Sequence, residues 1–185
     1  LLMLFLESTS EPLTVLPTHR VIHGLGEEGV SRLLAGLDGL FEVRPAARAD
    51  LLAADAGPGG EGRFGLWTGG SGLWLQARRQ AFEPLLPPGS PALRGLDVVL
   101  LGSALEHLAD IDQDAVAAGR VTYTKSPAEA LDAVDWGDAD AAVLLEPTPV
   151  AAIAAVAAAG EVMPQKSTYF YPKALTGLLI NPHEW

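Results

Sequence analysis

The sequence contains no cysteine, so neither a disulfide framework nor thiol chemistry can contribute to its fold or function. It is also poor in basic residues: 12 lysines and arginines face 23 aspartates and glutamates, for a formal net charge of −11. A surface this acidic repels the phosphate backbone of nucleic acids, and two basic residues are adjacent only at Arg78 and Arg79. The composition therefore argues against a nucleic-acid-binding protein.

The first residues, Leu1 to Leu6, form an apolar run that is too short to cross a bilayer, which takes about 20 residues. The run also lacks the basic start and the small-residue cleavage site of a signal peptide. We therefore expect a cytoplasmic protein that does not contact a membrane. Because the chain does not begin with methionine and residues 2–7 are typical of a buried strand, we also expect it to begin inside a larger protein.

The apolar pattern predicts an α/β (α+β) fold, in which a mixed β-sheet carries packed helices. Over 63–77, two apolar alternating segments flank four small turn residues, which predicts an antiparallel hairpin. Over 121–180 the predicted order is β-α-β-α-β, with helices that begin after Ser126 and Thr148, each of which is followed by proline. This alternation favours parallel pairing of some of these strands. The strands predicted there cover 121–124, 141–145 and 175–180.

Further elements are predicted upstream of this alternating region. A helix is expected at 27–37, where apolar residues share one face and two glutamates occupy the first turn. Strands are expected at 13–16 and 41–43. Residues 93–108 are apolar nearly all round, which indicates a buried helix, with a strand at 96–101 as the alternative.

Four prolines and a glycine fall within residues 84–91, a composition typical of a linker. We therefore expect one C-terminal domain, 1–185, which this linker would divide into lobes 1–83 and 92–185.

The segment Gly24-Leu25-Gly26-Glu27-Glu28-Gly29 matches the G-x-G-x-x-G pattern of dinucleotide-binding proteins. It follows strand-like residues and opens a helix, and Glu42 lies downstream near the spacing of a ribose-binding acid. An NAD-type dinucleotide-binding oxidoreductase is therefore one hypothesis. Against it, Glu27 and Glu28 would repel a pyrophosphate at the helix start, so an ordinary glycine turn is the alternative.

Two other segments imitate ligand loops but lack essential residues. Gly160 to Ser167 resembles a phosphate loop, yet Gln165 replaces its second glycine and Pro164 removes an amide. Asp110 to Asp114 begins like a calcium loop that has neither its glycine nor its closing glutamate. The four histidines show no metal-ligand spacing. We expect no metal site, and the sequence identifies no cofactor.

Two polar segments, 16–20 and 163–173, are not explained by packing alone. Lysines together with hydroxyl groups can bind a phosphate or carboxylate, and tyrosines can cover such a ligand. The alternative is a structured crossover whose tyrosines pack and whose lysines are solvated. His19 is the candidate for a catalytic proton transfer. The candidate ligand-binding residues are Thr18, His19, Arg20, Lys166, Ser167, Thr168, Tyr169, Tyr171 and Lys173.

The same two segments resemble an uncharacterised bacterial and archaeal family, domain-of-unknown-function family 1015. The segment Leu13-Thr14-Val15-Leu16-Pro17-Thr18-His19-Arg20 looks like one of its signatures. Met163 to Lys173, followed by Thr176-Gly177-Leu178, looks like its C-terminal signature. Leu93-Arg94-Gly95-Leu96-Asp97 and the spacing between the segments are also similar, so the resemblance covers nearly the whole chain.

The resemblance implies that the chain is the C-terminal half of a longer protein. Full-length members carry an upstream Asp-Gly-His-His-Arg segment that resembles the nucleotide-handling motif of the ParB and sulfiredoxin-like group, which includes a free-serine kinase. No such segment occurs in this sequence. The implied partners are the missing N-terminal half and a small anionic ligand. Neither nucleic acid nor a membrane is expected as a partner, and the question of whether the protein forms an oligomer is left open.

Three hypotheses about function result. The first is a phosphate- or nucleotide-handling protein, part of a small-molecule kinase, in which Arg20, Lys166 and Lys173 bind anions and His19 moves a proton. The second is a non-catalytic binding or scaffold module, because the sequence shows no complete catalytic set. The third is the dinucleotide-dependent oxidoreductase. Convergence of Arg20 and Lys166 on one cleft would indicate a site, whereas opposite placement would indicate structural roles.

Overall fold

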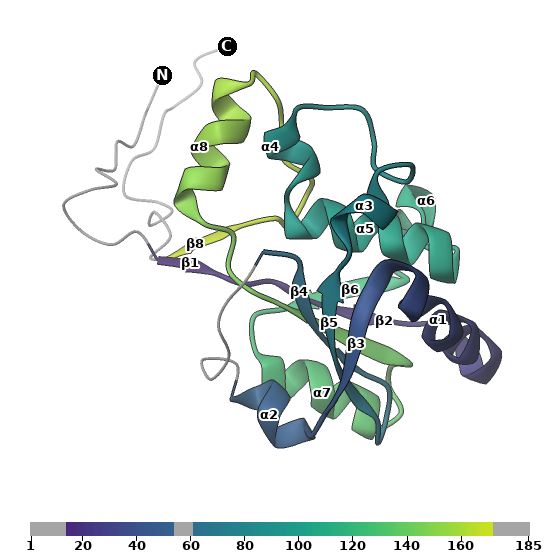
Figure 1. Cartoon of the computed structure of the whole chain (residues 1–185). Coiled ribbons are helices and arrows are strands. Elements are labelled where there is room, and N and C mark those ends of the chain that lie inside the picture. Colours follow the sequence, from purple (N-terminus) through teal and green to yellow (C-terminus); the bar gives the residue numbers. More distant parts are fainter. Residues whose placement is uncertain (1–13, 54–60, 172–185) are drawn as a thin grey trace, which may run out of the picture.

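A computed structural model of the chain describes residues 14–53 and 61–171 (Figure 1). The strands predicted at 2–7 and 175–180 lie outside the described residues. The strands are β1 (Thr14–Leu16), β2 (His19–Ile22), β3 (Phe41–Ala46), β4 (Arg63–Trp67), β5 (Gly72–Ala77), β6 (Val121–Thr124), β7 (Ala141–Leu145) and β8 (Tyr169–Tyr171). The helices are α1 (Gly26–Leu40), α2 (Arg48–Leu52), α3 (Arg79–Phe82), α4 (Pro91–Arg94), α5 (Asp97–Ala109), α6 (Gln113–Ala117), α7 (Pro127–Asp135) and α8 (Val150–Ala158).

Six strands form one sheet in the order β3-β5-β4-β7-β2-β6, and every described pair in it is antiparallel. The α+β fold with packed helices and the hairpin at 63–77 are confirmed. The predicted parallel pairing is wrong, although β6 and β7 do run in the same direction. The distant strand β2 lies between them and pairs with both, so that Arg20 is opposite Tyr123 on one side and Val143 on the other.

The local predictions agree well with the observed helices. Helix α1 covers the predicted 27–37. The helix predicted over 93–108 is two helices, α4 and α5, with Gly95 and Leu96 between them, and α5 rules out the alternative strand at 96–101. The Ser126 hydroxyl caps α7 by accepting a hydrogen bond from the Glu129 amide at 3.2 Å. Within the described part of the chain, no helix is long and apolar enough to span a membrane.

The predicted linker at 84–91 does not separate two sheets. Strand β7, which follows this segment in the sequence, lies between β4 and β2, which precede it. The two lobes suggested on either side of 84–91 therefore share one sheet.

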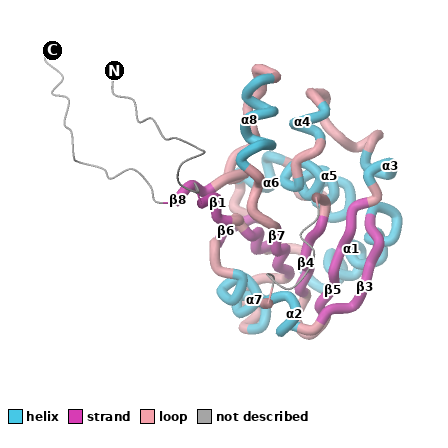
Figure 2. The backbone as a smooth tube through the Cα atoms, turned by 60° about the vertical axis from the view of Figure 1, so that its left-hand side comes forward, coloured by secondary structure: helices cyan, strands magenta, loops and turns pink. Residues whose placement is uncertain are grey.

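Different helices cover the two faces of the sheet (Figures 1 and 2). Side chains alternate along a strand, so Val143 and Leu145 of β7 pack in the core formed with α1 and α5. Ala142 and Leu144 of the same strand pack in the smaller core formed with α2 and α7. We call these surfaces of the sheet the α1/α5 face and the α2/α7 face.

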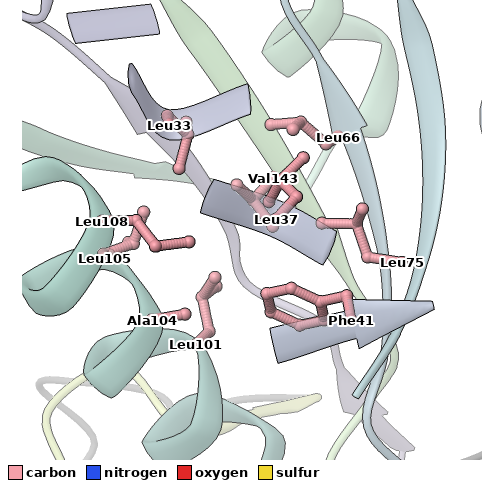
Figure 3. A pocket seen from close by; sticks show the side chains of 10 residues that line it. All are labelled: Leu33, Leu37, Phe41, Leu66, Leu75, Leu101, Ala104, Leu105, Leu108 and Val143. Atoms are coloured by element: carbon pink, nitrogen blue, oxygen red, sulfur yellow. The ribbon is translucent and has the colours of Figure 1, made fainter. Parts of the chain in front are cut away.

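A small void of about 20 Å³ lies inside the α1/α5 core (Figure 3). Only apolar side chains surround it, so a water molecule would find no hydrogen-bond partner there. The void is therefore an imperfection of core packing rather than a ligand site. Its lining comes from α1, α5 and the sheet: Leu33, Leu37, Phe41, Leu66, Leu75, Leu101, Ala104, Leu105, Leu108 and Val143.

Candidate functional site

The structure brings the two unexplained polar segments together. Strand β1 pairs with β8, which places Leu16 opposite Tyr169 and Thr14 opposite Tyr171. Arg20 lies in the next strand, β2, and its guanidinium donates a hydrogen bond from Nη2 to the main-chain carbonyl of Lys166, at 3.5 Å. Segments about 150 residues apart in the sequence therefore form one structural unit.

Arg20 holds this unit together through main-chain groups. Its side chain is buried, donates to the Thr18 carbonyl as well as to Lys166, and lies 5.5 Å from the centre of the Tyr123 ring. Burial lowers the pKa of Arg20 to about 10, so the group remains charged at neutral pH. The Lys166 side chain itself is exposed, and its φ of 59° is in the left-handed region.

The remaining candidates of the C-terminal segment have mostly local contacts. Ser167 is buried and its hydroxyl donates to the Pro164 carbonyl at 2.5 Å, while its own carbonyl accepts from Thr148 at 3.0 Å. Thr168 is half-buried and Tyr171 is exposed. Lys173 lies outside the described residues.

Removing the Arg20 guanidinium should loosen the attachment of β8. We expect Arg20→Met to speed amide hydrogen exchange in Tyr169–Tyr171 about tenfold, because the Lys166 carbonyl loses its charged donor, and to leave exchange in α5 unchanged. Mass spectrometry of the exchanged protein measures both. Arg32→Met, which removes an exposed ion pair with Asp110, is the control. Unchanged exchange in β8 would show that Arg20 does not anchor this strand.

His19 points to the opposite face of the sheet from Arg20, because neighbouring residues of a strand face opposite ways. It is only 4% exposed, and its Nδ1 accepts a hydrogen bond from the Leu145 amide at 3.2 Å. The neutral ring therefore carries its proton on Nε2, a buried donor that has no hydrogen-bond partner among the described residues. Burial, and secondarily the Arg20 charge, lowers the pKa of His19 to about 4, so the ring is uncharged at neutral pH.

His19 lines a cleft of about 540 Å³ on the α2/α7 face. Three residues on neighbouring strands form its base: His19 of β2, Leu144 of β7 and Gly65 of β4. Gly65 lets Leu51 of α2 pack closely against this base, since a Cβ there would lie 2.9 Å from Leu51 Cδ2. Trp74 of β5, the end of α2 and the residues around the start of α7 supply the sides.

Among its described residues, the cleft carries more positive than negative side chains, in contrast to the chain as a whole. Lys125 lies with Nζ 3.9 Å from the centre of the Tyr169 ring, and the Arg63 guanidinium lies 4.0 Å from the Trp74 ring. Glu146 is the acidic group of the lining. With an uncharged His19, the described residues of the lining carry a net charge of about +1, which favours an anion.

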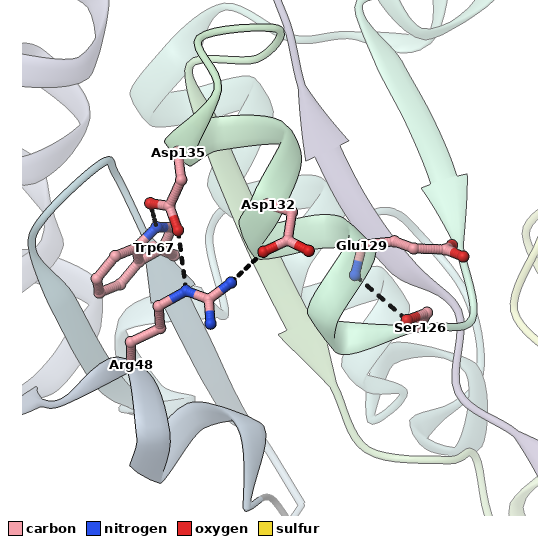
Figure 4. A network of polar contacts seen from close by, with 6 residues as sticks. All are labelled: Arg48, Trp67, Ser126, Glu129, Asp132 and Asp135. Carbon is pink, nitrogen blue, oxygen red and sulfur yellow. Dashed lines mark hydrogen bonds and ion pairs between the residues drawn. The ribbon is translucent and has the colours of Figure 1, made fainter.

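A polar network fixes the elements that form the sides of this cleft (Figure 4). Arg48 of α2 forms ion pairs with Asp132 and Asp135 of α7, the second at 2.9 Å. The Trp67 indole of β4 donates to Asp135 at 2.7 Å. Helix α2, helix α7 and strand β4 each contribute residues to the cleft, so the network holds its walls relative to one another.

The glycine pattern at 24–29 does not form a dinucleotide site. The Asp140 carboxylate already accepts hydrogen bonds from the Leu25 and Gly26 amides, at 2.9 and 3.2 Å, where a pyrophosphate would have to bind. The preceding strand β2 also lies between antiparallel neighbours, unlike the parallel strands of dinucleotide-binding folds. The third hypothesis is therefore corrected to an ordinary glycine turn.

The two other imitations of ligand loops have structural roles. Residues 160–167 follow helix α8 instead of the strand that a phosphate loop requires. Asp110 ends α5 in a left-handed conformation, and Asp112 caps α6 by accepting from the Ala115 amide at 2.8 Å. Within the described ranges, no group of three potential metal ligands comes together.

The sequence alone singled out His19 but neither Lys125 nor Glu146. A signal for both exists, because Lys125 directly follows β6 and Glu146 directly follows β7. These strands run in the same direction, so their C-terminal ends reach the same edge of the sheet. Arg63 and Trp74 carried no comparable signal, since both fall within the alternating hairpin.

No family model matches the chain, and no curated protein sequence matches it. Among solved structures, it is similar to a mutant free serine kinase in complex with AMP, with 19% identity and a TM-score of 0.50, covering 89% of this chain and 57% of that one. The free serine kinase in complex with AMP gives 18% identity and a TM-score of 0.49, covering 89% and 56%. A conserved hypothetical protein from Pyrococcus furiosus gives 20% and 0.49, covering 89% and 59%. The chain thus spans less than two thirds of these proteins, and the likeness is one of fold.

Proposed function

We propose that the chain binds a small phosphorylated ligand in the cleft beside His19, as part of a phosphate- or nucleotide-handling, kinase-like protein. One observation carries the proposal: His19 lines the cleft, and its buried Nε2 donor has no partner among the described residues. A buried donor without a partner costs about 1–3 kcal/mol, so a ligand acceptor at this point would stabilise the site.

The charges around His19 favour an anionic acceptor. The imidazole remains a neutral donor at every pH well above 4, while Lys125 and Arg63 contribute positive charge from two sides. A phosphate group, with several acceptor oxygens and about two negative charges, can accept from His19 and pair with Lys125 at once. In this arrangement His19 binds and orients the ligand, and its low pKa suits a hydrogen-bond donor better than a group that takes up a proton.

The resemblance to domain-of-unknown-function family 1015 and the fold likeness to a free serine kinase in complex with AMP are consistent with such a ligand. We extend the proposal to an upstream half that would complete a catalytic centre with this cleft. Nucleotides and phosphorylated metabolites are concentrated in the cytoplasm, which is the compartment that the proposal assigns.

Binding to adenine nucleotides and inorganic phosphate tests the proposal. We expect AMP, ADP or ATP to bind in calorimetry and to raise the melting temperature, and Lys125→Ala to weaken binding about tenfold by removing a charge from the cleft. Lys166→Ala is the matched control, because it removes the same charge from an exposed side chain outside the cleft lining.

The two variants also distinguish binding in the cleft from binding at the C-terminal segment. If Lys166→Ala weakens binding and Lys125→Ala does not, the ligand lies at residues 163–171 instead. If neither nucleotides nor phosphate bind, the phosphate-handling proposal is wrong. The second hypothesis, a non-catalytic scaffold module, then takes its place, and the main-chain hydrogen bonds of Arg20 and Thr148 favour it.

A further inference from the structure

The positive charge that the cleft offers to a ligand comes mainly from Lys125. The other cation of the lining, Arg63, has an acidic neighbour: Phe64 is opposite Leu145 in the sheet, so Arg63 lies opposite Glu146 on the adjacent strand. Opposite charges at such positions offset one another. Lys125, by contrast, directly follows β6 and is exposed, and no ion pair reaches it among the described residues.

A lysine in this position has a cost for binding. Its side chain has four rotatable carbons, and ordering one rotamer when a ligand arrives opposes association. A lysine that is already held in the cleft avoids part of this loss. The affinity of the proposed phosphate site therefore depends on what restricts Lys125.

The contact that restricts Lys125 comes from the C-terminal segment. Its Nζ lies over the ring of Tyr169, 3.9 Å from the centre, which is within the range of a cation–π contact. In this position Lys125 still belongs to the lining, so the ring holds the ammonium in the cleft rather than away from it. A ring also attracts the cation without neutralising it, whereas a carboxylate in the same place would compete with an anionic ligand.

The Tyr169 ring is itself placed by segments that form the edge of the cleft. Tyr169 belongs to β8, and its partner strand β1 leads directly into Pro17 of the lining. Just before β8, the Ser167 carbonyl accepts a hydrogen bond from the hydroxyl of Thr148 at 3.0 Å, and Thr148 directly follows Pro147 of the lining. The position of the ring is therefore fixed relative to the cleft.

We infer that Tyr169 is a positioning residue of the phosphate site: its ring holds the Lys125 ammonium in the cleft, where it can bind an anion. This inference rests on the proposed phosphate site and adds a role for the C-terminal segment, which acts on the ligand through Lys125 rather than by touching it. An ammonium has three N–H groups, so Lys125 can contact the ring and still donate to a phosphate.

The contact can be measured without a ligand. In proton NMR, the ring current of Tyr169 should move the signals of the Lys125 ε-methylene group upfield, because the end of this side chain lies over the ring face. Tyr169→Leu should abolish the shift, and Tyr169→Phe, which keeps the ring, should retain it. If the wild-type signals show no ring-current shift, the inference is wrong whatever the ligand.

Calorimetry with AMP and with inorganic phosphate tests the effect on binding. We expect Tyr169→Leu to weaken binding about threefold and Tyr169→Phe to leave it unchanged. In the Lys125→Ala background, Tyr169→Leu should have no further effect, since it acts through the lysine. Phenylalanine at position 169 that carries one, two or three fluorine atoms should weaken binding step by step, because fluorine withdraws negative charge from the ring face. A role in packing alone predicts no such trend.

The control variant is Tyr171→Leu, which removes the same kind of ring from the same strand at a position where the side chain is 59% exposed. It should keep both the ring-current shift and the affinity of wild type. Equal weakening by Tyr171→Leu and Tyr169→Leu would mean that a loosened β8, rather than the ring over Lys125, affects the site. Melting curves without ligand confirm that the variants fold.

The other outcomes separate this inference from the proposed function. If the wild-type protein binds phosphate and Tyr169→Leu binds it equally well or better, the positioning role is overturned and the phosphate site remains. If Tyr169→Leu weakens binding as much without Lys125 as with it, the ring touches the ligand itself, which also overturns the role. If neither AMP nor phosphate binds to wild type, the phosphate site and the inference fall together, even where the ring-current shift is present.

Discussion

Replacing Asp97 by asparagine should stabilise the folded protein at pH 7 by about 2 kcal/mol, although it removes a charge from the start of a helix. Burial, with Glu61 and Glu146 nearby, raises the pKa of Asp97 to about 6 from its usual 3.8. Each pKa unit corresponds to about 1.4 kcal/mol, so keeping this carboxyl ionised costs the folded state up to about 3 kcal/mol, which partial exposure reduces. Asparagine keeps the oxygen that accepts from the Gly62 amide at 2.6 Å.

Urea denaturation at pH 7 measures the effect, with Asp140→Asn as the contrasting variant. The Asp140 carboxylate accepts from two amides at the start of α1, so its replacement should cost about 1 kcal/mol. The advantage of Asp97→Asn should also disappear near pH 4, where the Asp97 carboxyl is protonated in the folded state. A destabilised Asp97→Asn protein at pH 7 would mean that the charged hydrogen bond to Gly62 outweighs burial.

Much of the local structure could be predicted from the sequence, because its signals are local. The Ser126-Pro127 pair marked the start of α7, and the apolar face of 27–37 marked α1. Strand pairing is not local. Nothing within 121–145 shows that β2, about 100 residues earlier, lies between β6 and β7, and this insertion turned an expected parallel pair into two antiparallel pairs.

The site was predicted only in part, for a related physical reason. The sequence singled out residues 16–20 and 163–173 but left open whether they converge, and β1, β8 and Arg20 connect the described parts of both. Neighbouring side chains of β2 point to opposite faces of the sheet, so the candidates of residues 16–20 do not share one site. Arg20 faces the α1/α5 side, and His19 faces the cleft. The candidate anion ligand Lys125 enters the cleft only because the ends of β6 and β7 meet at one edge of the sheet.

His19 provides a second large dependence of stability on pH. In the unfolded chain the ring takes up a proton below its usual pKa of 6.5, whereas in the folded chain it does so only below about 4. Between these values the unfolded state binds more protons, so stability falls as the pH is lowered through this window. The difference of 2.5 units corresponds to about 3 kcal/mol.

Asp97 acts in the opposite direction over nearly the same range. Between pH 3.8 and about 6 its folded form holds a proton that the unfolded chain has lost, so stability falls as the pH is raised. In the wild-type protein the contributions of His19 and Asp97 should therefore nearly cancel between pH 4 and 6. The stability of the wild-type protein would then change little with pH, although the pKa values of both groups are strongly shifted.

Single variants should expose each contribution in urea denaturation at pH 4, 5, 6 and 7. We expect the stability of Asp97→Asn, relative to wild type, to increase with pH by about 2 kcal/mol, since the variant lacks the Asp97 carboxyl, whose contribution to wild-type stability falls as the pH rises. His19→Gln, whose amide oxygen can still accept from the Leu145 amide, should show the opposite slope. The other carboxylates affect all the proteins alike, so the differences isolate the two groups. If the free energy of unfolding of His19→Gln depends on pH in the same way as that of wild type, His19 is not the buried neutral donor on which the phosphate site depends.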